Sequence, residues 1–439
     1  MNKALENLKE RGFISQCTSL DGLSAAFDAG SVTFYVGCDP TGRSLHIGHM
    51  VPFFAFRHLL KAGHKGIALI GGGTARIGDP SGKTEMRKML SYEELNANAD
   101  AIQAQLERFF EGVNGAAGSS GSSSVIFANN KDWLAGLNYI DFLRDIGRHF
   151  SVNRMLSFEA YKKRMETGLS FIEFNYQLLQ SYDFLQLYKR YNCRLQIGGD
   201  DQWGNIVAGM ELIRRTEGDA AGFCGGLTFP LVTTADGKKM GKTEKGALFL
   251  APDITSPYEF FQYWRNVQDA DVLRFLLLFT FLATEECRAL CAEGKNPNAA
   301  KERLAYEVTA LIHGKDEAEK ALSGARAAFG NAGNGAANSA SGDISAMPSK
   351  ELPRASFEAG YNIVDLFTDA GLAGSKSEAR RLVEQGGAFA GTDAGTLTAI
   401  TDIKTVFSTA VLTDGALLLR AGKKRYCRII AVLNGGTAL

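Results

Sequence analysis

The sequence predicts an α/β protein whose first part is built on a doubly wound parallel sheet. Short apolar segments of the kind that form strands begin near residues 32, 66, 125, 193 and 227. Helical patterns lie between them, and this alternation of strand and helix favours parallel neighbours in one sheet. Polar or glycine-rich segments follow the strands, and ligands of such sheets bind where the strands end. We therefore expect a binding site formed by these segments.

Composition narrows the class of protein. The chain has 439 residues, enough for two or three domains, and its 48 basic residues balance 48 acidic ones, so any basic surface must be local. Seven cysteines without C-x-x-C spacing favour free thiols over structural zinc. The first residues do not resemble a signal peptide, and the longest apolar run, Phe275 to Leu282, is too short to cross a membrane. We expect a cytoplasmic protein without a membrane segment.

The first strand, Val32 to Val36, runs into the turn Asp39-Pro40-Thr41-Gly42, and an apolar helix is predicted from Leu45 to Gly63. His46 and His49 are three positions apart and would share one face of its first turn. Helix N-termini attract anions because their N–H groups are free and the helix dipole is positive there. Two imidazoles and the Thr41 hydroxyl at that end would suit a polyphosphate, although the histidine spacing alone also occurs in ordinary helices.

The next segments continue the alternation. A buried strand at 66–70 ends in three glycines, and Lys83 and Arg87 follow at a spacing that places them on one helix face. Further predictions are a helix at about 91–111, a flexible Gly/Ser/Ala-rich surface insertion at 112–124, a strand at 125–130 and helices to about 191. A strand at 193–197, a helix at 202–215 and a strand at 227–233 complete this part.

The rest of the chain divides into smaller parts. Residues 255–330 have a wholly helical pattern, and 331–347 form a low-complexity linker of Gly, Ala, Asn and Ser. Beyond it, two short helices and a strand with a basic turn indicate a small α+β unit. The predicted division is a first, α/β domain at 1–250, a helical domain at 251–330, a linker at 331–350 and the small domain at 351–439.

One predicted helix, 171–191, carries a polar stripe. Tyr176, Gln180 and Asp183 fall on one face, at positions i, i+4 and i+7. The stripe is either a solvent face or the wall of a buried polar site. Its neighbours are Phe, Leu and Tyr rather than Lys and Glu, which favours the buried site, and buried polar groups need partners such as a ligand.

Three motifs resemble those of one family. Residues 39–49, Asp-Pro-Thr-x-x-x-Leu-His-Ile-Gly-His, resemble the first signature of class I aminoacyl-tRNA synthetases. The segment 239–243, Lys-Met-Gly-Lys-Thr, is similar to the second signature, with Gly and Thr in place of two serines, a departure that suits the tyrosyl family. Residues 173–185 resemble the amino-acid-binding helix of tyrosyl-tRNA synthetases. The resemblance covers most of residues 30–330 and implies a Rossmann-like catalytic domain that uses ATP, L-tyrosine and tRNA(Tyr).

The resemblance also implies roles for individual residues. In the tyrosine site, Tyr176, Gln180 and Asp79 would hold the ammonium group, Asp183 and Tyr35 the phenol oxygen, and Thr74, Asn130 and Gln202 further positions. The groups that act on the ATP phosphates would be Thr41, His46, Lys83, Arg87, Lys239 and Lys242. His49, Asp39 and Asp201 would bind the adenosine part, beside Gly37 and Gly199. Mg²⁺ is expected to accompany ATP, without a dedicated metal site.

The last part of the chain has a resemblance of its own. Residues 372–387 and 420–426 are similar to a small RNA-binding fold first known from a ribosomal protein. The implied tRNA-binding residues are Lys376, Arg380, Arg381, Lys423, Lys424 and Arg425, although these clusters could also be an ordinary solvated edge. The family further implies a homodimer that holds one tRNA across both subunits.

Two alternatives share much of this pattern. A tryptophanyl-tRNA synthetase has the same fold and both signatures, but it has no need of a carboxylate and a phenol, Asp183 and Tyr35, aimed at one hydroxyl. An RNA-binding scaffold descended from a synthetase would have lost its catalytic groups. His46, His49, Lys239 and Lys242 argue against that alternative because both signatures keep their basic residues.

Overall fold

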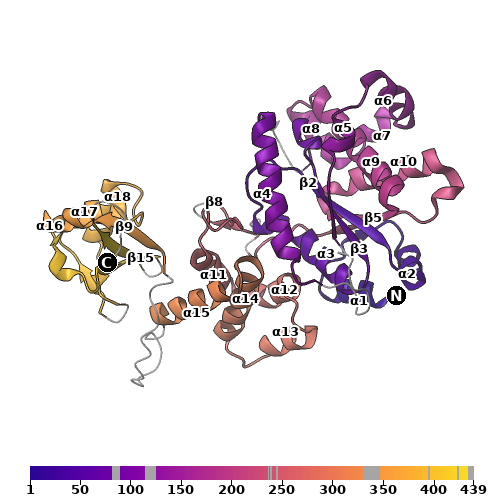
Figure 1. Cartoon of the computed structure of the whole chain (residues 1–439). Helices are drawn as coiled ribbons and strands as arrows, with labels where there is room; N and C mark the ends of the chain where they lie inside the picture. The colour runs from indigo at the N-terminus through magenta and orange to yellow at the C-terminus, as the bar shows by residue number, and fades with distance from the viewer. Residues whose placement is uncertain are drawn as a thin grey trace. The chain divides into compact units, whose positions relative to one another are not determined.

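The computed structural model describes residues 1–81, 89–113, 125–235, 237, 240–243, 246–329, 347–393, 396–422 and 425–433. The chain forms two compact units (Figure 1). The first contains Met1–Ile254 and Gln268–Ala300, and the second contains Thr255–Val267 and Lys301–Leu439. The predicted domain bounds remain a prediction, and most of the predicted insertion and linker lies outside the described residues.

The first unit is built on a six-stranded sheet with the order β1-β6-β5-β2-β3-β4. All neighbours are parallel except the pair β1–β6, which confirms the predicted doubly wound parallel sheet. The strand order reverses at β2, which lies between β3 and β5, and the ends of these strands are where such sheets bind ligands. The strands are β1 (Gln16–Cys17), β2 (Thr33–Cys38), β3 (Lys65–Ile70), β4 (Val125–Asn129), β5 (Cys193–Gly199) and β6 (Gly225–Phe229).

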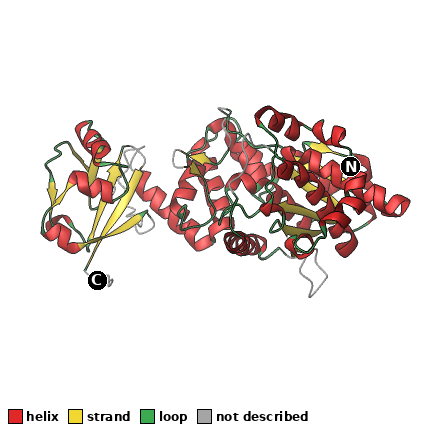
Figure 2. Ribbon diagram, turned by 90° about the horizontal axis from the view of Figure 1, so that it is seen from above, coloured by secondary structure: helices red, strands yellow, loops and turns green. Residues whose placement is uncertain are grey.

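Helices cover both faces of this sheet (Figure 2). The helices of the first unit are α1 (Lys3–Glu10), α2 (Leu20–Ala29), α3 (Val51–Lys61), α4 (Tyr92–Phe110), α5 (Lys131–Leu134), α6 (Tyr139–Asp145), α7 (Val152–Leu156), α8 (Glu159–Thr167), α9 (Phe171–Tyr191), α10 (Trp203–Glu217), α12 (Asp269–Phe279) and α13 (Thr284–Leu290). Adjacent residues of β2 contact opposite faces, as the period of a strand requires. Phe34 packs against Phe56 of α3 with 4.7 Å between ring centroids, and Tyr35 packs against Phe184 of α9 with 5.3 Å.

Two predicted boundaries were wrong. The helix predicted from Leu45 begins only at Val51, after a single 3₁₀ turn at Ile47–His49. The reason is a distant segment: Ile47 N donates to Leu248 O and Leu250 N donates to Leu45 O, both at 2.9 Å, so the chain at His46 is extended. The strand predicted to reach Thr233 ends at Phe229, directly before Pro230, which has no N–H for a sheet.

The second unit contains helices and a small α+β part. The helices α11 (Pro257–Arg265) and α15 (Lys315–Phe329) belong to it, and α14 (Pro297–His313) runs into it from the first unit, so the helical prediction for 255–330 is confirmed. The last part has a five-stranded sheet of order β12-β11-β14-β15-β9. Its elements are β9 (Ser349–Pro353), α16 (Arg354–Glu358), β10 (Tyr361–Asn362), α17 (Ile363–Asp369), α18 (Lys376–Glu384), β11 (Ala388–Gly391), β12 (Thr398–Ile400), β13 (Val406–Phe407), β14 (Ala416–Ala421) and β15 (Arg425–Val432).

No helix in the described part of the chain is both long and apolar enough to cross a membrane.

Two buried histidines make the first unit sensitive to acid. Burial, together with the charges of Arg11, Lys61 and Arg57, holds the pKa of His58 well below its ordinary value. Burial lowers the pKa of His64 to about 4, and its Nδ1 accepts a hydrogen bond from Val32 N at 3.2 Å. In the unfolded chain both histidines have pKa values of about 6.5. As the pH falls, the unfolded chain therefore becomes protonated at these histidines before the folded protein does. Their contribution to stability is complete above about pH 6.5 and is lost as the pH falls towards the folded values.

We therefore expect the urea midpoint of the protein to fall as the pH is lowered from about 6.5 to 4. The variant His64→Gln cannot titrate, so its midpoint should depend less steeply on pH over this range. Parallel urea titrations at several pH values measure the difference. Equal slopes for the two proteins would contradict the assignment of this acid sensitivity to His64.

Candidate active site

A chain of polar side chains crosses the carboxyl ends of the strands. Asp39 follows β2, Thr74 follows β3 and Asn130 follows β4, while Asp183 projects from α9. Thr74 Oγ1 donates to Asp39 Oδ1 at 2.7 Å. Asn130 Nδ2 donates both to Thr74 Oγ1 and to Asp183 Oδ2, each at 2.9 Å. The structure therefore connects four of the predicted site residues, which lie far apart in the sequence, by direct hydrogen bonds.

The close approach of the turn after β3 to Asp39, which follows β2, requires a glycine at position 71. A Cβ added to Gly71 would lie 2.0 Å from Asp39 Oδ1 and 2.6 Å from Thr74 Oγ1. Any side chain there would displace the carboxylate and the hydroxyl that form the hydrogen bond. The run of three glycines after β3 thus allows a close approach at Gly71 rather than only a flexible turn.

Asp183 is a buried carboxyl with two nitrogen donors. Besides Asn130, Trp133 Nε1 donates to its Oδ1 at 2.7 Å. Burial raises the pKa of Asp183 to about 8, although the hydrogen bonds from Asn130 and Trp133 act in the opposite direction. The two donors fix the orientation of the carboxyl group, and its burial favours the protonated form.

Tyr35 presents a buried hydroxyl next to this carboxyl. Its side chain is 1% exposed, and its oxygen has no hydrogen-bond partner among the residues that the structure describes. Burial, followed by the charge of Asp183, raises the pKa of Tyr35 well above its ordinary value. A buried polar group without a partner is costly, and a bound ligand can supply the missing one.

A second group of predicted residues lies beside the first. Gln202 Nε2 donates to Asp79 Oδ2 at 2.8 Å, and Gln180 Nε2 donates to Gln202 Oε1 at 3.2 Å. Tyr176, four positions before Gln180 on α9, donates from Oη to Asp39 Oδ2 at 3.0 Å. Burial, followed by the charges of Asp39 and Asp79, raises the pKa of Tyr176 well above its ordinary value. This arrangement of carboxylates and amide oxygens is suited to an ammonium group.

The histidines of the first signature follow the turn after β2 in the sequence. The rings of His46 and His49 stack with 3.6 Å between centroids and 27° between planes. They belong to the 3₁₀ turn and the residue before it rather than to α3. Thr41 and Gly37 are exposed, and Thr41 N donates to Asp39 O at 2.8 Å. At the end of β5, a Cβ on Gly199 would lie 2.6 Å from Asp201 Oδ1, so the backbone approaches this carboxylate closely.

Comparison with known proteins agrees with this arrangement. The family model described as tRNA synthetases class I (W and Y) matches residues 28–330. The Tyrosine--tRNA ligase of Treponema denticola is 62% identical over 431 residues, which are 98% of this chain and 100% of that protein. The chain belongs to the tyrosine–tRNA ligases.

Other tyrosine–tRNA ligases match at lower identity. That of Caldanaerobacter subterraneus is 49% identical over 427 residues, covering 97% of this chain and 98% of that one. The crystal structure of a C-terminally truncated mitochondrial tyrosyl-tRNA synthetase from Aspergillus nidulans has a TM-score of 0.66 at 32% identity and covers 74% of this chain and 93% of that one. A tryptophanyl-tRNA synthetase from Encephalitozoon cuniculi, 13% identical with a TM-score of 0.51, shares the fold only. The tryptophan alternative therefore has weaker support than membership in the tyrosine–tRNA ligases.

Trp133 is a site residue that the sequence analysis missed. It lies in the short helix α5, three positions after Asn130, and both residues donate to Asp183. A signal was present, because a tryptophan that follows a strand is often buried, and a buried indole N–H needs a partner. In a tyrosine–tRNA ligase this side chain would act through Asp183 rather than through the substrate.

Several predicted residues cannot be placed. Lys83, Arg87, Lys239, Lys423 and Lys424 lie outside the described residues. For Lys242 only the backbone is described, in the short strand β7 (Lys242–Thr243), which pairs with β8 (Gly246–Ala247). In the small C-terminal sheet region, Lys376 Nζ pairs with Asp365 Oδ1 at 2.7 Å and Arg425 Nη1 lies 3.9 Å from Glu378 Oε1. Arg380 and Arg381 are exposed on α18.

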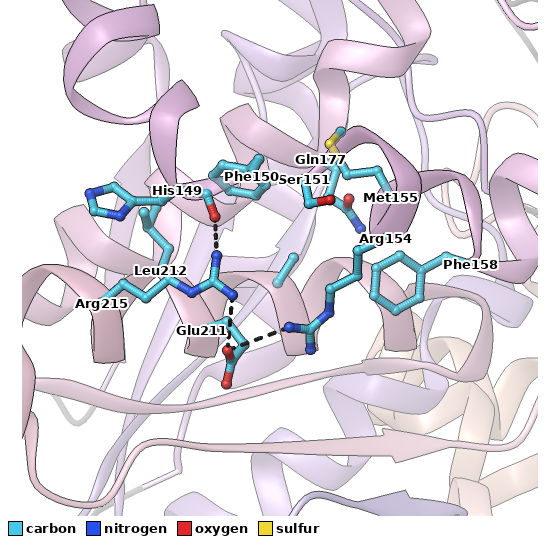
Figure 3. Close-up of a pocket in the computed structure, with 11 residues that line it drawn as sticks. His149, Phe150, Ser151, Arg154, Met155, Phe158, Gln177, Glu211, Leu212 and Arg215 are labelled. Atoms are coloured by element: carbon cyan, nitrogen blue, oxygen red, sulfur yellow. Dashed lines mark hydrogen bonds and ion pairs between the residues drawn. The ribbon is translucent and has the colours of Figure 1, made fainter.

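A pocket beside α7 and α10 is separate from these residues (Figure 3). Its lining includes Arg154, Glu211 and Arg215, and Glu211 Oε2 lies 3.6 Å from nitrogen atoms of both arginines. None of the predicted site residues lines it. The lining includes Gln177 of α9, which is next in sequence to Tyr176 of the predicted polar stripe. The candidate active site is therefore the polar group at the strand ends.

Proposed function

We propose that this chain activates L-tyrosine with ATP to form tyrosyl-adenylate and then transfers tyrosine to the 3′ end of tRNA(Tyr). In the first step the tyrosine carboxylate attacks the α-phosphorus of ATP, and pyrophosphate leaves. In the second step a ribose hydroxyl of the terminal adenosine attacks the carbonyl carbon, and AMP leaves. Substrate groups are the nucleophiles in both steps, so the protein contributes position and charge.

The observation that carries this proposal is the pair formed by Tyr35 and Asp183. A phenol oxygen placed between them would accept from Tyr35, whose hydroxyl lacks a partner among the described residues, and donate to the buried carboxyl of Asp183. Phenylalanine would leave both groups unpaired. Sites of this kind reject the analogue that lacks the hydroxyl by about 10⁴–10⁵-fold, and tyrosyl-tRNA synthetases are the standard example of the principle.

The second group of polar side chains supports a role at the tyrosine ammonium. Asp79, Gln180 and Tyr176 have the charge and the oxygen atoms for this role, and Gln202 connects Asp79 to Gln180. The Gln180 Oε1 atom is buried and has no partner among the described residues. Thr74 and Asn130 would hold Asp39 and Asp183 in place through the hydrogen bonds described above.

The assignment of residues to ATP binding depends mainly on the family resemblance. Thr41, His46, Lys83, Arg87, Lys239 and Lys242 are proposed to stabilise charge on the departing pyrophosphate. His49, Asp201, Gly37 and Gly199 are proposed to hold the adenosine part, and Asp39 would serve there and at Tyr176, to which it is already bonded. Mg²⁺ is proposed to enter bound to the ATP phosphates, since it keeps several waters and prefers such oxygen ligands.

An ATP–pyrophosphate exchange assay with each of the twenty amino acids tests the proposed function. Exchange that depends on tyrosine, with phenylalanine and tryptophan at background, is the expected result. Exchange with tryptophan instead would support the tryptophanyl alternative. Binding of tRNA without exchange for any amino acid would support the RNA-binding scaffold.

The C-terminal domain, proposed to span residues 351–439, is assigned to tRNA binding. Its support is the exposed pair Arg380 and Arg381 on α18, beside Lys376 and Arg425, whose partners are acidic side chains of the same part. The proposed adenylation residues all precede position 250, within the proposed catalytic domain at 1–250. A helical domain at 251–330 and a linker at 331–350 would separate the two functions.

Truncation at Ser341 should separate the two functions in an experiment. The shortened chain should retain tyrosine-dependent exchange and lose most tRNA charging, with a weaker dependence of tRNA binding on salt because fewer phosphate contacts remain. Charging assays and binding isotherms at several salt concentrations measure both effects. Full charging by the shortened chain at moderate salt would contradict a role in tRNA binding. The basic residues would then be an ordinary solvent-exposed edge of the domain.

A homodimer is also proposed, from the family resemblance. Large apolar side chains in the segment from α6 to α9 are exposed, among them Ile140 (69%) and Phe171 (70%), and a second copy could cover them. Sedimentation equilibrium of the full chain gives the mass directly, and a monomer at micromolar concentration would count against the proposal. A cytoplasmic location stays a prediction.

A further inference from the structure

Helix α4 lies along the loop that carries the first signature. The loop, residues 40–45, contains Thr41 and ends one residue before His46. Asn98 Nδ2 of α4 donates to Pro40 O at 3.2 Å, at one end of the loop. Gln105 Oε1 accepts from Leu45 N at 3.0 Å, at the other end. The two side chains are seven positions apart, which places them two turns apart on one face of the helix, about 10 Å along its axis.

Gln105 also reaches a third segment through Ser44. Gln105 Nε2 donates to Ser44 Oγ at 3.1 Å, and the same oxygen accepts from Ala251 N at 3.0 Å. Leu250 N donates to Leu45 O, and Leu248 N donates to Gly241 O in the second signature. One side chain of α4 therefore meets the junction between the backbone of the first signature and the strand-like segment that follows the second.

These two polar side chains are not needed to attach α4 to the sheet. The helix already packs through Leu95, Ile102 and Leu106, which are at most 3% exposed. What Asn98 and Gln105 add is a fixed position of the loop relative to the helix. The N–H of Leu45 has a side-chain oxygen as its partner, and Leu45 is itself buried, so loss of that oxygen would leave a buried donor unpaired.

We propose that Asn98 and Gln105 are positioning residues for the adenylation step, which hold Thr41 and His46 in the geometry that the ATP phosphates require. The inference rests on the proposed function, because it assigns these residues to the ATP side of that reaction. They act through the loop and do not touch the substrates. We call Asn98 and Gln105 the brace. The tyrosine site is held by other contacts, those of Asn130, Trp133 and Thr74. Loss of the brace should therefore slow the step that uses ATP without weakening the binding of tyrosine.

The test compares Asn98→Ala and Gln105→Ala with two matched controls on the same helix, Asn96→Ala and Gln103→Ala. Asn96 Oδ1 contacts only the exposed Lys131 Nζ at 3.5 Å among the hydrogen bonds described, and Gln103 Nε2 donates to Glu107 on its own helix. Single-turnover formation of tyrosyl-adenylate gives the rate constant per active site, and equilibrium dialysis gives the tyrosine dissociation constant. Hydrogen exchange of peptides that cover residues 40–48 reports the loop without substrates.

Each brace variant should form adenylate roughly 10-fold to 100-fold more slowly than wild type, the usual cost of a misplacement of about 1 Å. The tyrosine dissociation constant should stay within about twofold, and the amides of residues 41–48 should exchange faster. Gln105→Glu keeps the acceptor for Leu45 N and loses the donor to Ser44, so its rate should lie between those of wild type and Gln105→Ala. The control variants should match wild type in all three measurements.

Two results would overturn the inference. One is adenylate formation in both brace variants within about twofold of the controls. The other is an equal loss in brace and control variants, which would mean that α4 is merely destabilised. If wild type itself formed no tyrosyl-adenylate, the proposed function would fall instead, and faster exchange in the brace variants alone would still support the bracing of the loop. Asn98→Ala removes a single hydrogen bond, so it provides the test if Gln105→Ala fails to fold.

Discussion

Asp183→Asn should reduce kcat/KM for tyrosine by about 10³-fold or more while changing the low value for phenylalanine little. The carboxyl accepts from Trp133 and Asn130 with its two oxygens, and asparagine can offer only one oxygen to these two donors. The amide nitrogen of the variant would face an N–H donor or the phenol of the substrate. Steady-state exchange kinetics with both amino acids give the ratio.

Tyr35→Phe provides the matched comparison for this prediction. It removes a hydroxyl that has no partner among the described residues, so the free energy of unfolding of the free protein should stay the same or rise slightly. Discrimination between tyrosine and phenylalanine should nevertheless fall, by roughly 10-fold for one lost hydrogen bond to the substrate. Equal tyrosine/phenylalanine ratios in wild type and in both variants would contradict the placement of the phenol oxygen between Asp183 and Tyr35.

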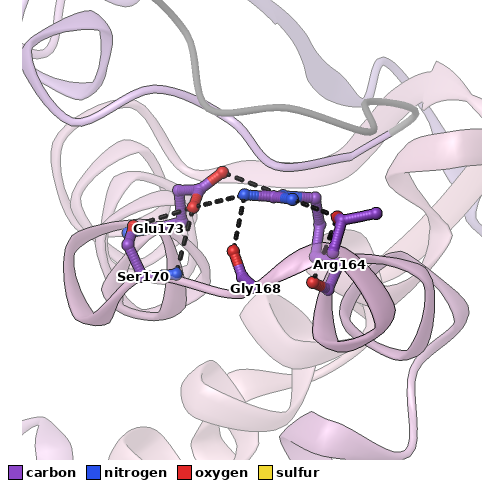
Figure 4. A network of polar contacts seen from close by, with 5 residues as sticks. Arg164, Gly168, Ser170 and Glu173 are labelled. Carbon is purple, nitrogen blue, oxygen red and sulfur yellow. Dashed lines mark hydrogen bonds and ion pairs between the residues drawn. The ribbon is translucent and has the colours of Figure 1, made fainter.

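Arg164→Met should lower the free energy of unfolding by about 3–5 kcal/mol, the usual result of removing one partner of a buried ion pair. Arg164 Nε and Nη2 donate to the two oxygens of Glu173 at 3.1 and 2.9 Å, and Nη2 also donates to Gly168 O (Figure 4). Both side chains are at most 4% exposed. Although burial alone would raise it, hydrogen bonds from Arg164 and Ser170 leave the pKa of Glu173 below its ordinary value.

The large effect comes from the buried charge of Glu173 that is left without a partner, and Glu173 also lies at the start of α9. Its carboxylate completes a capping box with Ser170, and α9 carries Tyr176, Gln180 and Asp183 further along. The double variant Arg164→Met/Glu173→Leu removes both charges and should recover most of the lost stability. The free energy of unfolding of Arg164→Lys should lie between those of wild type and Arg164→Met, because lysine keeps the charge but cannot form the bidentate contact. Urea unfolding at constant pH measures all three, and a double variant no more stable than Arg164→Met would contradict the account.

The sequence predicted best where local signals agreed with the fold. Helix α9 has the predicted bounds because Ser170 caps its start with Glu173, and Asn192, with a φ of 52°, ends it in the left-handed conformation. The order of strands and helices was predicted because apolar strand segments, buried between two layers of helices, leave a strong pattern. The tyrosine-site residues came from the resemblance, and their contacts in the structure are consistent with that grouping.

Prediction failed where distant segments decide the local structure. Residues 45–49 were predicted to begin a helix, yet His46 is extended because the backbone on either side of it pairs with Leu248 and Leu250. Neither segment alone indicates this pairing. Trp133 was missed for a related reason, since its role depends on Asp183, 50 positions later in the chain. The antiparallel edge strand β1 has only two residues, too few for a period to be recognised.

The pairing of the first signature with the segment beyond the second has a consequence for synthesis on the ribosome. Ser44 and Ala251 are 207 positions apart, and contacts of such separation form late because a long loop must first be closed. A nascent chain that has exposed β2, β3 and β4 can already pair these neighbouring strands. It still lacks the partner that keeps His46 extended, and the sequence around His46 favours helix until that partner emerges. The histidines would therefore take up their final positions only after translation has passed residue 251, so a prematurely released chain would be folded in part and unable to use ATP.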